Sequence, residues 1–526
     1  MKLTKSLAIV MAATMLLSSL SACGSESSKQ SATAGNSAAG AANTSEAKLG
    51  KTDIVLAQKS DIKSTDPHVS NDTTTHVVLE HLYNSLLTIA PDGTIQGDLA
   101  KEWTQVSPTE WKFVLNEGVK FHDGTELKAS DVKFSLEREK ASARLAQKVE
   151  VVQEVKVDGD YTFSLILSKP YAPLLVNLAH PGSSILSEKA VTSAGDKYAE
   201  NPIGTGPMKF KEWVPNDHIT LVRNDDYFEG AGRTTSMTIR VIPEGPSRTI
   251  SLETGEVDIV PVMEKVDVPR VKEDKNLTAF VFPSTTVEYF AMNTQKAPFD
   301  NVKVRQAMNY AINKQDIITV SSEGLADPVD TLISSQVRSY NDQVTHYDFN
   351  PDKAKALLAE AGYPNGFSTT IFVSGDVRNR TAQLIQANLA TIGVTADIEL
   401  YEWGAFLDAI NAGQHATFIS GWSNSSLDPD ESFNPLFHTK NAGATGNRSF
   451  YSNPEVDALL EAAETEADDA KRMQLYSDIQ VKVVDDAPWV PLFCAQTCMG
   501  ARAGLDGLNP HPVVSSTKYY DVCYLG

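Results

Sequence analysis

Basic residues are scarce in this sequence. The 526-residue chain has 46 Lys and Arg residues against 67 Asp and Glu residues, so its formal net charge is −21 at pH 7. Few positive charges are available to neutralise phosphates, and we therefore expect no nucleic-acid partner. Hydrophobic residues make up 41% of the chain and charged residues 21%, which is typical of a globular protein. A chain of this length has room for two or three domains, each with its own core.

Cysteine and histidine are also sparse, with four and ten residues respectively. Beyond the N-terminal segment only Cys494, Cys498 and Cys523 remain, and because this number is odd, at least one thiol would stay outside any disulfide within the chain. Cys494 and Cys498 have no histidine nearby, so we expect buried thiols rather than a metal site. His76 and His81 are five residues apart and do not share a helical face. The sequence thus predicts no metal and no cofactor.

The common catalytic motifs are missing. There is no nucleophile elbow, no HExxH and no paired Cys/His motif, which argues against a hydrolase. The run Gly204-Thr205-Gly206 lacks the Lys-Ser/Thr of a phosphate-binding loop and the full dinucleotide spacing, so nucleotide binding is rejected. We expect a protein that is not an enzyme.

The N-terminal segment has no apolar run long enough to span a bilayer comfortably. Ser6 to Leu20 is mostly apolar, follows the two lysines of MKLTK and leads to Leu20-Ser21-Ala22-Cys23. This tetrapeptide resembles the lipobox of bacterial lipoproteins, which implies a signal peptide over 1–22 and a lipid anchor on Cys23; an uncleaved signal anchor is the alternative. The following Ser/Ala/Gly-rich residues predict a flexible tether over 23–50.

One strand–helix–strand unit ends in a polar loop. The strand and helix are indicated by alternating and helically spaced apolar residues, and Gly413 ends the helix: Ala396, Ile398, Leu400, Trp403, Phe406, Leu407 and Ile410. A second apolar strand, Thr417 to Gly421, leads into the loop from Ser423 to Asp430. Such loops, after the carboxyl end of a buried strand, hold ligands in α/β folds. Because this loop has no His, Cys or Lys, we expect binding rather than catalysis; an ordinary surface turn is the alternative.

Other patterns divide the chain into regions. Alternating residues before and after a turn at 158–160 predict a β-hairpin, within an α+β region of about a hundred residues. Further on, helical and strand patterns alternate, which predicts an α/β sheet domain. A helix there is capped by Asp300-Asn301 and presents Val304, Ala307 and Met308 on one face. Acidic residues 461–469 are interpreted as a solvated helix face, not a metal site.

Five long stretches of the sequence match a known family and occur in the same order as in that family: KFHDGTELKASDVKFSLER, NPIGTGPMKF, NTQKAPFDNVKVRQAMNYAINK, NPDKAKALLAEAGYPNGF and YSNPEVDALL. Together they resemble the extracytoplasmic solute-binding proteins of peptide/nickel-type ABC importers, the dipeptide- and oligopeptide-binding family. The resemblance implies an α/β fold of two hinged lobes, of the periplasmic-binding-protein type, with an additional α+β insert domain. The implied boundaries are a discontinuous lobe I over 51–90, 205–288 and 495–526, an insert domain over 91–204, and lobe II over 289–494.

The same resemblance implies a ligand site between the lobes. In this family strand edges pair with a peptide's backbone, an aspartate binds its amine and an arginine can bind its carboxylate. The loop GWSNSSLDPD matches the family's loop, with Trp422 at an aromatic position. The amine-binding aspartate would fall at Ser425, and this departure argues against a free dipeptide, because a buried ammonium without a carboxylate is costly. Asp428 or Asp430 would then be the substitute.

Three arginines are candidates for the rest of the site. Arg380 is the predicted partner of a ligand carboxylate, with Arg378 as the competing choice, and Arg138 is a third cation that would line the cleft. The predicted ligand-binding set is Trp422, Ser423, Asn424, Ser425, Asp428, Arg380 and Arg138.

These features predict a membrane-tethered, extracytoplasmic substrate-binding lipoprotein, monomeric, that delivers a peptide or peptide-like solute to an ABC permease. Within the same fold the solute is alternatively a nickel chelate, an opine, a glycan fragment or glutathione. A surface sensor or adhesin is the alternative from another class.

Overall fold

Two long strands run through the centre of the fold, β12 (Leu277–Met292) and β17 (Trp489–Arg502). The computed structural model describes residues 49–70, 72–444 and 446–526, all within one compact unit. The predicted signal peptide, the lipid-anchor residue Cys23 and most of the predicted tether lie outside the described residues. Within the described part, none of the helices combines the length and apolarity needed to cross a membrane.

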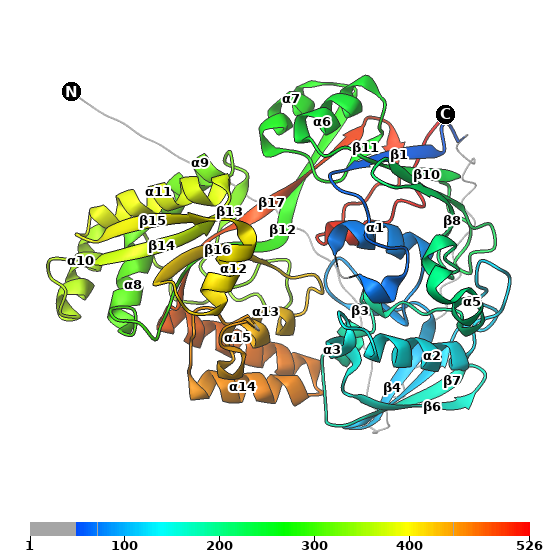
Figure 1. The fold of residues 1–526 in the computed structure, drawn as a ribbon, viewed down its shortest axis with the longest axis horizontal. Helices are drawn as coiled ribbons and strands as arrows, with labels where there is room; N and C mark the ends of the chain where they lie inside the picture. Colours follow the sequence, from blue (N-terminus) through cyan, green and yellow to red (C-terminus); the bar gives the residue numbers. More distant parts are fainter. Residues whose placement is uncertain (1–48, 71, 445) are drawn as a thin grey trace, which may run out of the picture. The chain divides into compact units, whose positions relative to one another are not determined.

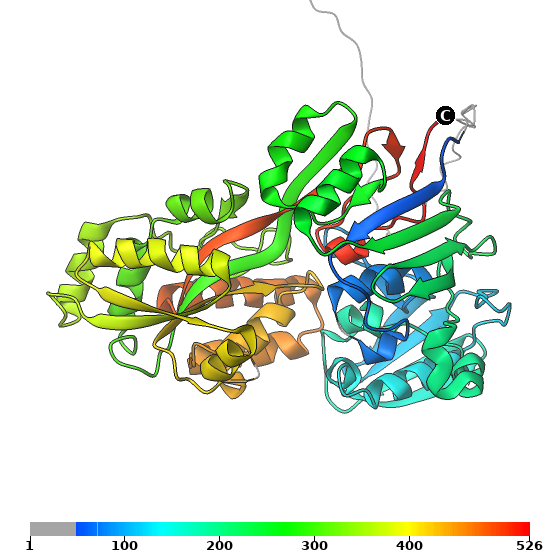
Figure 2. The ribbon, with the colours of Figure 1, turned by 45° about the horizontal axis from the view of Figure 1, so that its top comes forward.

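β12 and β17 lie in the middle of an 11-stranded sheet, whose order is β15-β14-β16-β12-β17-β11-β1-β10-β9-β8, with β13 paired to β17. Residues 277–283 of β12 pair with 496–502 of β17, and residues 287–291 pair with 489–494. An irregularity in the register between Pro283 and Val287 separates the two halves of the pair. Both strands therefore continue from one lobe into the other and connect them (Figures 1 and 2).

The first lobe contains the chain's opening strand and its C-terminal residues. Parallel pairing of β1 with β10 and antiparallel pairing of β10 with β9 and of β9 with β8 extend the sheet on this side. The elements of this lobe are β1 (Asp53–Gln58), α1 (Thr73–Leu82), α5 (Glu188–Ala194), β8 (Met208–Val214), β9 (His218–Arg223), β10 (Ser236–Val241), α6 (Gly245–Thr254), β11 (Ile259–Val260), α7 (Val268–Glu273), β18 (Leu505–Asp506) and β19 (Cys523–Tyr524).

A separate four-stranded antiparallel sheet, in the order β4-β5-β7-β6, lies beside α1 and α5 of the first lobe and is covered by α2 (Figure 1). The predicted hairpin is confirmed as β6 and β7 of this sheet. The region around this sheet contains β2 (Leu87–Ile89), β3 (Ile95–Gly97), β4 (Ala100–Ser107), β5 (Glu110–Leu115), α2 (Ala129–Lys140), α3 (Ala146–Val149), β6 (Val152–Gly159), β7 (Thr162–Leu167) and α4 (Leu174–Asn177).

The second lobe is an α/β sheet in which β14 pairs in parallel with β15 and β16. β16 in turn pairs with β12, which joins this part to the central strands. Its elements are α8 (Val302–Ala311), α9 (Lys314–Ser321), β13 (Ala326–Pro328), α10 (Pro351–Glu360), β14 (Ser368–Ser374), α11 (Asp376–Ala390), β15 (Thr395–Tyr401), α12 (Trp403–Asn411), β16 (Thr417–Ser423), α13 (Asp430–Phe437), α14 (Pro454–Thr465) and α15 (Asp469–Asp486). Short 3₁₀ turns occupy Pro67–Val69, Pro181–Ser183, Gly195–Glu200, Lys265–Asp267, Thr439–Asn441 and Val514–Ser516.

Each of the three regions has its own hydrophobic core. The second lobe buries a cluster drawn from residues 289–493. The four-stranded sheet buries a cluster from residues 86–185, and the first lobe buries one that joins residues 54–83 to residues 186–259 and 499–522. The two-lobed α/β fold expected from the sequence is confirmed, while the individual domain boundaries stay predictions.

Several local expectations are corrected. Glu464, within the acidic stretch expected to be solvated, is 8% exposed and pairs with Lys169 at 2.6 Å. Leu49 and Gly50, which were assigned to the tether, pair with Leu525 and Tyr524 at the C-terminus. The three described cysteines are buried free thiols, as expected.

The Gly204–Gly206 run is explained by packing. A Cβ at Gly204 would lie 1.9 Å from the carbonyl oxygen of Leu82, and one at Gly206 would lie 2.5 Å from the carbonyl oxygen of His81. Only glycine lets this turn approach the C-terminal end of α1 so closely.

Candidate functional site

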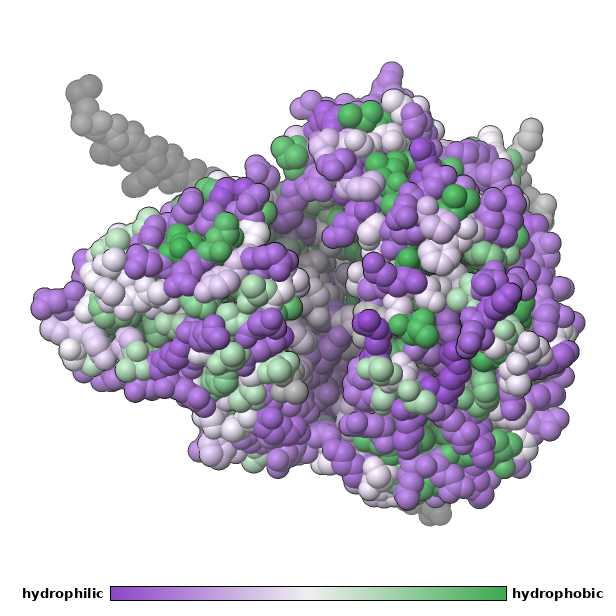
Figure 3. All heavy atoms as spheres, viewed as in Figure 1, coloured by the Kyte–Doolittle hydropathy of each residue, from purple (hydrophilic) through white to green (hydrophobic). Residues whose placement is uncertain are grey.

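A cavity of about 460 Å³ lies where the loop at 425–427 of the second lobe meets the first lobe and the four-stranded-sheet region. Figure 3 shows a deep furrow between the part that contains α8–α12 and the part that contains α1 and α5. The cavity wall comes from segments far apart in sequence, including α1, residues 84–98, residues 176–184 and the C-terminal residues 507–521. Its volume falls within the range of cavities that hold small solutes.

The predicted strand–helix–strand unit is confirmed as β15, α12 and β16, and the loop that follows is held by its own residues. Asn424 donates from its backbone to the Thr285 carbonyl at 3.2 Å and from its amide to the Asp428 carbonyl at 2.7 Å. The carboxylate of Glu431 accepts four bonds of 2.6–2.8 Å, from the backbone and hydroxyl groups of Ser425 and Ser426. These bonds hold the loop in a conformation in which Ser425, Ser426 and Leu427 line the cavity.

Asp428 has a structural partner. Its two carboxylate oxygens each accept a bond of 2.6 Å from the guanidinium of Arg472, and both side chains are at most 4% exposed. The neighbouring Asp430 accepts from the hydroxyl of Tyr476 at 2.8 Å, and burial raises the pKa of Asp430 to about 6. Asp428 is almost inaccessible and is not part of the cavity wall, so it holds the loop to α15, and its contact with a ligand amine stays a prediction that this arrangement does not support.

The predicted arginines are dispersed. Arg138 donates to both oxygens of Asp66, at 2.9 and 2.5 Å, and this pair ties α2 to the segment before α1. Arg380 is exposed on α11, whereas Arg378 is paired with the carboxylate of Glu288 at 3.0 and 2.9 Å. Within the described part of the chain, none of the three arginines belongs to the cavity wall. Contacts from Arg138 or Arg380 to a solute stay predictions that this arrangement does not support.

Trp422 and Ser423 end β16 beside the central strands. Trp422 is half-buried against the second-lobe core, and its indole nitrogen is without a hydrogen-bond partner among the described residues. Ser423 is exposed, and its hydroxyl lies 2.7 Å from that of Thr286 in β12. Both residues therefore connect the loop to the strands that join the lobes, and their contact with a solute stays a prediction.

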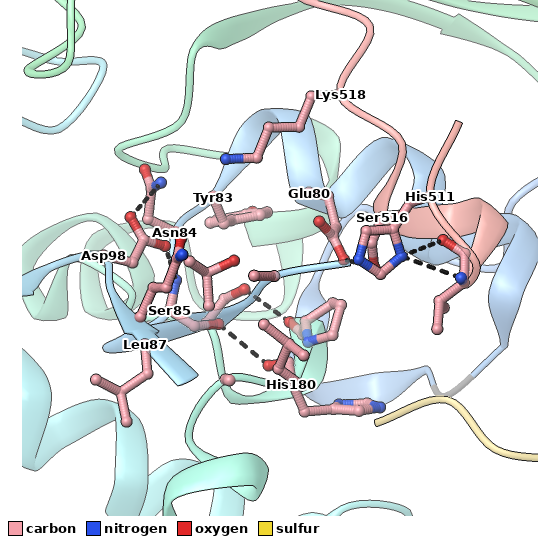
Figure 4. A pocket seen from close by; sticks show the side chains of 18 of the residues that line it. Glu80, Tyr83, Asn84, Ser85, Leu87, Asp98, His180, His511, Ser516 and Lys518 are labelled. Carbon is pink, nitrogen blue, oxygen red and sulfur yellow. Dashed lines mark hydrogen bonds between the residues drawn. The ribbon is translucent and has the colours of Figure 1, made fainter. Parts of the chain in front are cut away.

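The opposite wall of the cavity is acidic. Asp98 accepts from the amide of Asn84 at 2.8 Å and from the backbone N–H of Ser85 at 3.1 Å (Figure 4). Tyr227 donates to Glu229 at 3.1 Å, and both residues line the cavity. Burial, assisted by the negative charge of Glu229, raises the pKa of Asp98 to about 8.

Glu80 of α1 is a third carboxyl group in this wall. Its carboxylate accepts from the hydroxyl of Ser516 at 2.8 Å, and burial raises its pKa to about 7. Lys518 reaches over the cavity toward the Asn84–Asp98 end (Figure 4). Lys148 of α3 lines another part of the wall, where burial lowers its pKa.

Sequence analysis missed this wall. Glu80, Asp98, Glu229 and Lys518 lie in four separate segments, and nothing in their local patterns distinguishes them from ordinary polar positions. Their common property is spatial, because α1, the turns around β3 and β10 and the C-terminal tail converge only in the folded chain.

Comparisons with known proteins agree with this architecture. Residues 94–444 match the family model described as bacterial extracellular solute-binding proteins, family 5 Middle. The dipeptide-binding protein of Escherichia coli is 35% identical over 442 residues, covering 77% of this chain and 82% of that protein. The glutathione-binding protein GsiB of Pectobacterium atrosepticum is 32% identical over 460 residues, covering 83% and 88%.

A solved structure shows the same fold. The periplasmic binding protein DppA of Helicobacter pylori, in complex with the peptide STSA, has a TM-score of 0.75 and 30% identity, and the match covers 90% of this chain and 98% of that one. Members of this family are binding proteins, which agrees with a cavity between two lobes. The chain belongs to the family 5 bacterial extracellular solute-binding proteins.

Proposed function

We propose that this protein captures a short peptide or peptide-like solute in the cavity beside the 425–427 loop and delivers it to an ABC permease. The observation that carries the proposal is the cavity of about 460 Å³, which takes its wall from both lobes. A solute bound there would contact both lobes at once and would favour the arrangement in which they meet. The peptide-bound relative and the dipeptide-binding relative support a peptide as the solute.

A substitution that fills the cavity tests the proposal. Ala179 lines the cavity, so Ala179→Trp should occupy part of the solute's space, whereas Ala143→Trp places the same side chain at an exposed position outside it. A panel of di-, tri- and tetrapeptides is then screened by thermal unfolding. A peptide at 100 times its Kd should stabilise the wild type and Ala143→Trp by about 2.7 kcal/mol, and Ala179→Trp far less. Equal stabilisation of all three proteins would contradict the assignment of the cavity.

We also propose a lipid anchor at Cys23, which would hold the protein near the permease. The described fold begins at residue 49, where Leu49 pairs with Leu525. Cys23→Ser should release the otherwise unchanged, monomeric protein from the membrane fraction into the medium or periplasm. Retention of Cys23→Ser at the membrane, measured by cell fractionation, would argue instead for an uncleaved signal anchor.

A further inference from the structure

One end of the cavity carries three carboxyl groups without a cationic partner. Asp98, Glu229 and Glu80 all line the wall, and across residues 49–70, 72–444 and 446–526 none of them has a Lys, Arg or His nitrogen within 4 Å. The nearby Asp521 differs, because Arg233 pairs with its carboxylate at 3.0 Å. Asp98 and Glu80 are half-buried, and such carboxylates are normally paired, whereas Glu229 is exposed. This end of the cavity therefore has a deficit of positive charge.

Neutral donors hold two of these groups in position. The hydroxyl of Thr205 donates to the amide oxygen of Asn84 at 3.0 Å, which leaves the Asn84 NH₂ group to donate to Asp98 at 2.8 Å and to the Tyr227 hydroxyl at 3.2 Å. The Tyr227 hydroxyl in turn donates a hydrogen bond to the Glu229 carboxylate at 3.1 Å. Each carboxylate oxygen can accept more than one bond, so both groups keep acceptor capacity for a donor inside the cavity.

The lysines of the wall do not balance this charge. Lys518 is exposed, and its positive charge lowers the pKa of both Asp98 and Glu80 without offsetting the effect of burial, which leaves the two values at about 8 and about 7. Lys148 interacts electrostatically with Glu431 and Glu139. Around neutral pH Asp98 thus retains its proton for most of the time, and Glu80 does so for part of it.

We propose that this end of the cavity binds an ammonium or guanidinium group of the solute, with Asp98 and Glu229 as its carboxylate partners. The inference rests on the proposed function, because it specifies the chemistry of the solute that the same cavity takes. Charge-assisted bonds to the two carboxylates would supply the cationic partner that both groups lack and would offset the cost of desolvating Asp98. The solute's positive group is either a peptide's α-amine or a basic side chain.

Proton release is a measurable consequence. A bound cation favours the ionised form of Asp98, so binding of a protonated solute at pH 7 should expel up to about one proton per solute. Calorimetric binding enthalpies in phosphate and in Tris should differ at pH 7 because the two buffers take up the released proton with different enthalpies.

The solute test uses four probes: Ala-Ala-Ala, N-acetyl-Ala-Ala-Lys, N-acetyl-Ala-Ala-Ala and 1,4-diaminobutane. The first has an α-amine, the second has only a side-chain amine, the third has neither, and the fourth is a cation without a peptide bond. We expect at least one amine-bearing peptide to bind at least about 10-fold more tightly than N-acetyl-Ala-Ala-Ala. We also expect 1,4-diaminobutane to raise the unfolding temperature above that in NaCl of equal ionic strength.

Matched variants show which carboxyl groups cause the tighter binding of the amine-bearing probe and the proton release. Asp98→Asn and Glu229→Gln should each weaken binding of the amine-bearing probe by about 10-fold or more, and Asp98→Asn should also abolish proton release. Asp92→Asn removes the same charge from an exposed turn six residues earlier and should change neither quantity. Glu229 is exposed, so Glu229→Gln keeps the test valid if Asp98→Asn disturbs folding.

The outcomes separate this inference from the peptide assignment. If the acetylated neutral peptide binds as tightly as the amine-bearing ones, the cation inference is overturned while peptide binding stands. If no peptide binds but 1,4-diaminobutane stabilises the wild type and not Glu229→Gln, the cation inference stands and the peptide assignment fails. If 1,4-diaminobutane has no effect and no proton is released with any probe, the cation inference is wrong.

Discussion

Asp428 illustrates how a polar residue of a binding loop can serve the scaffold. Its carboxylate and the Arg472 guanidinium are both almost inaccessible and form two bonds of 2.6 Å. The pair joins the loop after β16 to α15. Desolvating both charges offsets most of the pair's Coulombic gain, but a lone buried charge would be much less stable.

Removing one partner should therefore be costly. Arg472→Met leaves the Asp428 carboxylate buried and unpaired, and we expect a loss of about 3–5 kcal/mol in the free energy of unfolding. Lys482→Met, which breaks an exposed pair with Glu455, should lower the free energy of unfolding far less. Urea denaturation of the two variants makes the comparison. Similar losses in both would show that the buried pair has no special role.

Glu139 gives a pH dependence with a defined sign. It is 1% exposed, accepts from the Ser183 hydroxyl at 2.7 Å, and burial raises its pKa from the ordinary 4.5 to about 8. Because the folded state holds the proton more tightly, the stability from this group is complete below about pH 4.5 and is lost as the pH rises to about 8.

Glu139→Gln should remove that loss. Relative to the variant, the wild type should lose about 1.4 kcal/mol per pH unit between pH 5 and 8, and the difference should level off above pH 8. Glu137→Gln, an exposed neighbour on α2, is the control and should show no such trend. A constant difference between wild type and Glu139→Gln over this pH range would contradict the raised pKa.

At this scale the sequence predicted only part of the site. Ser425 was identified because it lies in the polar loop after an apolar strand and because the family's amine-binding aspartate would fall there, and it does line the cavity. Asp428 was named as the substitute for that aspartate, yet its partner Arg472 lies 44 residues away and could not be inferred from local pattern. Asp98 and Glu229 were missed for the equivalent reason, since burial and mutual proximity depend on tertiary packing.

At the scale of elements, β12 and β17 explain how the lobes are joined. Their register changes between Pro283 and Val287. The loop after β16 is attached at the same place, because the backbone of Asn424 donates to the Thr285 carbonyl. A change in the twist of these strands would thus move the loop with the lobes. Hinge motions of this kind concentrate in a few residues of the connecting segments.

Regular elements were more predictable than their ends. The helix after Asp300-Asn301 is α8 with Asn301 as its cap, because one apolar face and one capping residue suffice to define it. The helix α1 has Asp72 as its cap and ends at Leu82, yet Leu86 beyond its end is also fully buried. Apolar spacing alone does not show where a helix ends, because residues beyond its last turn can still enter the core.

Lys169 and Glu464 form a contact between the four-stranded-sheet region and the second lobe. Their side chains pair at 2.6 Å, and the backbone N–H of Ala172 donates to the Glu464 carbonyl at 2.8 Å. Lys169→Ala should weaken the arrangement in which the lobes meet and raise the Kd for a bound peptide by up to about fivefold. Lys156→Ala, which breaks a pair with Asp158 within the hairpin itself, should leave Kd unchanged. Unchanged affinity in both variants, measured by calorimetry, would show that the contact does not contribute to closure.

At the scale of the whole molecule, the cavity, the central strands and the contact at Glu464 describe one mechanism. In the function proposed above, a solute in the cavity would bridge the loop at 425–427 and the acidic wall, and its binding energy would favour the closed arrangement of the lobes. To carry the protein from mostly open to mostly closed, the solute must prefer the closed form by roughly 5 kcal/mol. The closed form is then the one expected to dock on a permease.

The identity of the natural solute tests this account most directly. Native mass spectrometry of residues 24–526, purified gently and then denatured, would release whatever the cavity holds for sequencing. The account predicts a mixture of short peptides, each with a free amine or a basic side chain. Release of a single non-peptide species or a metal chelate, or an empty protein that no peptide stabilises, would contradict it.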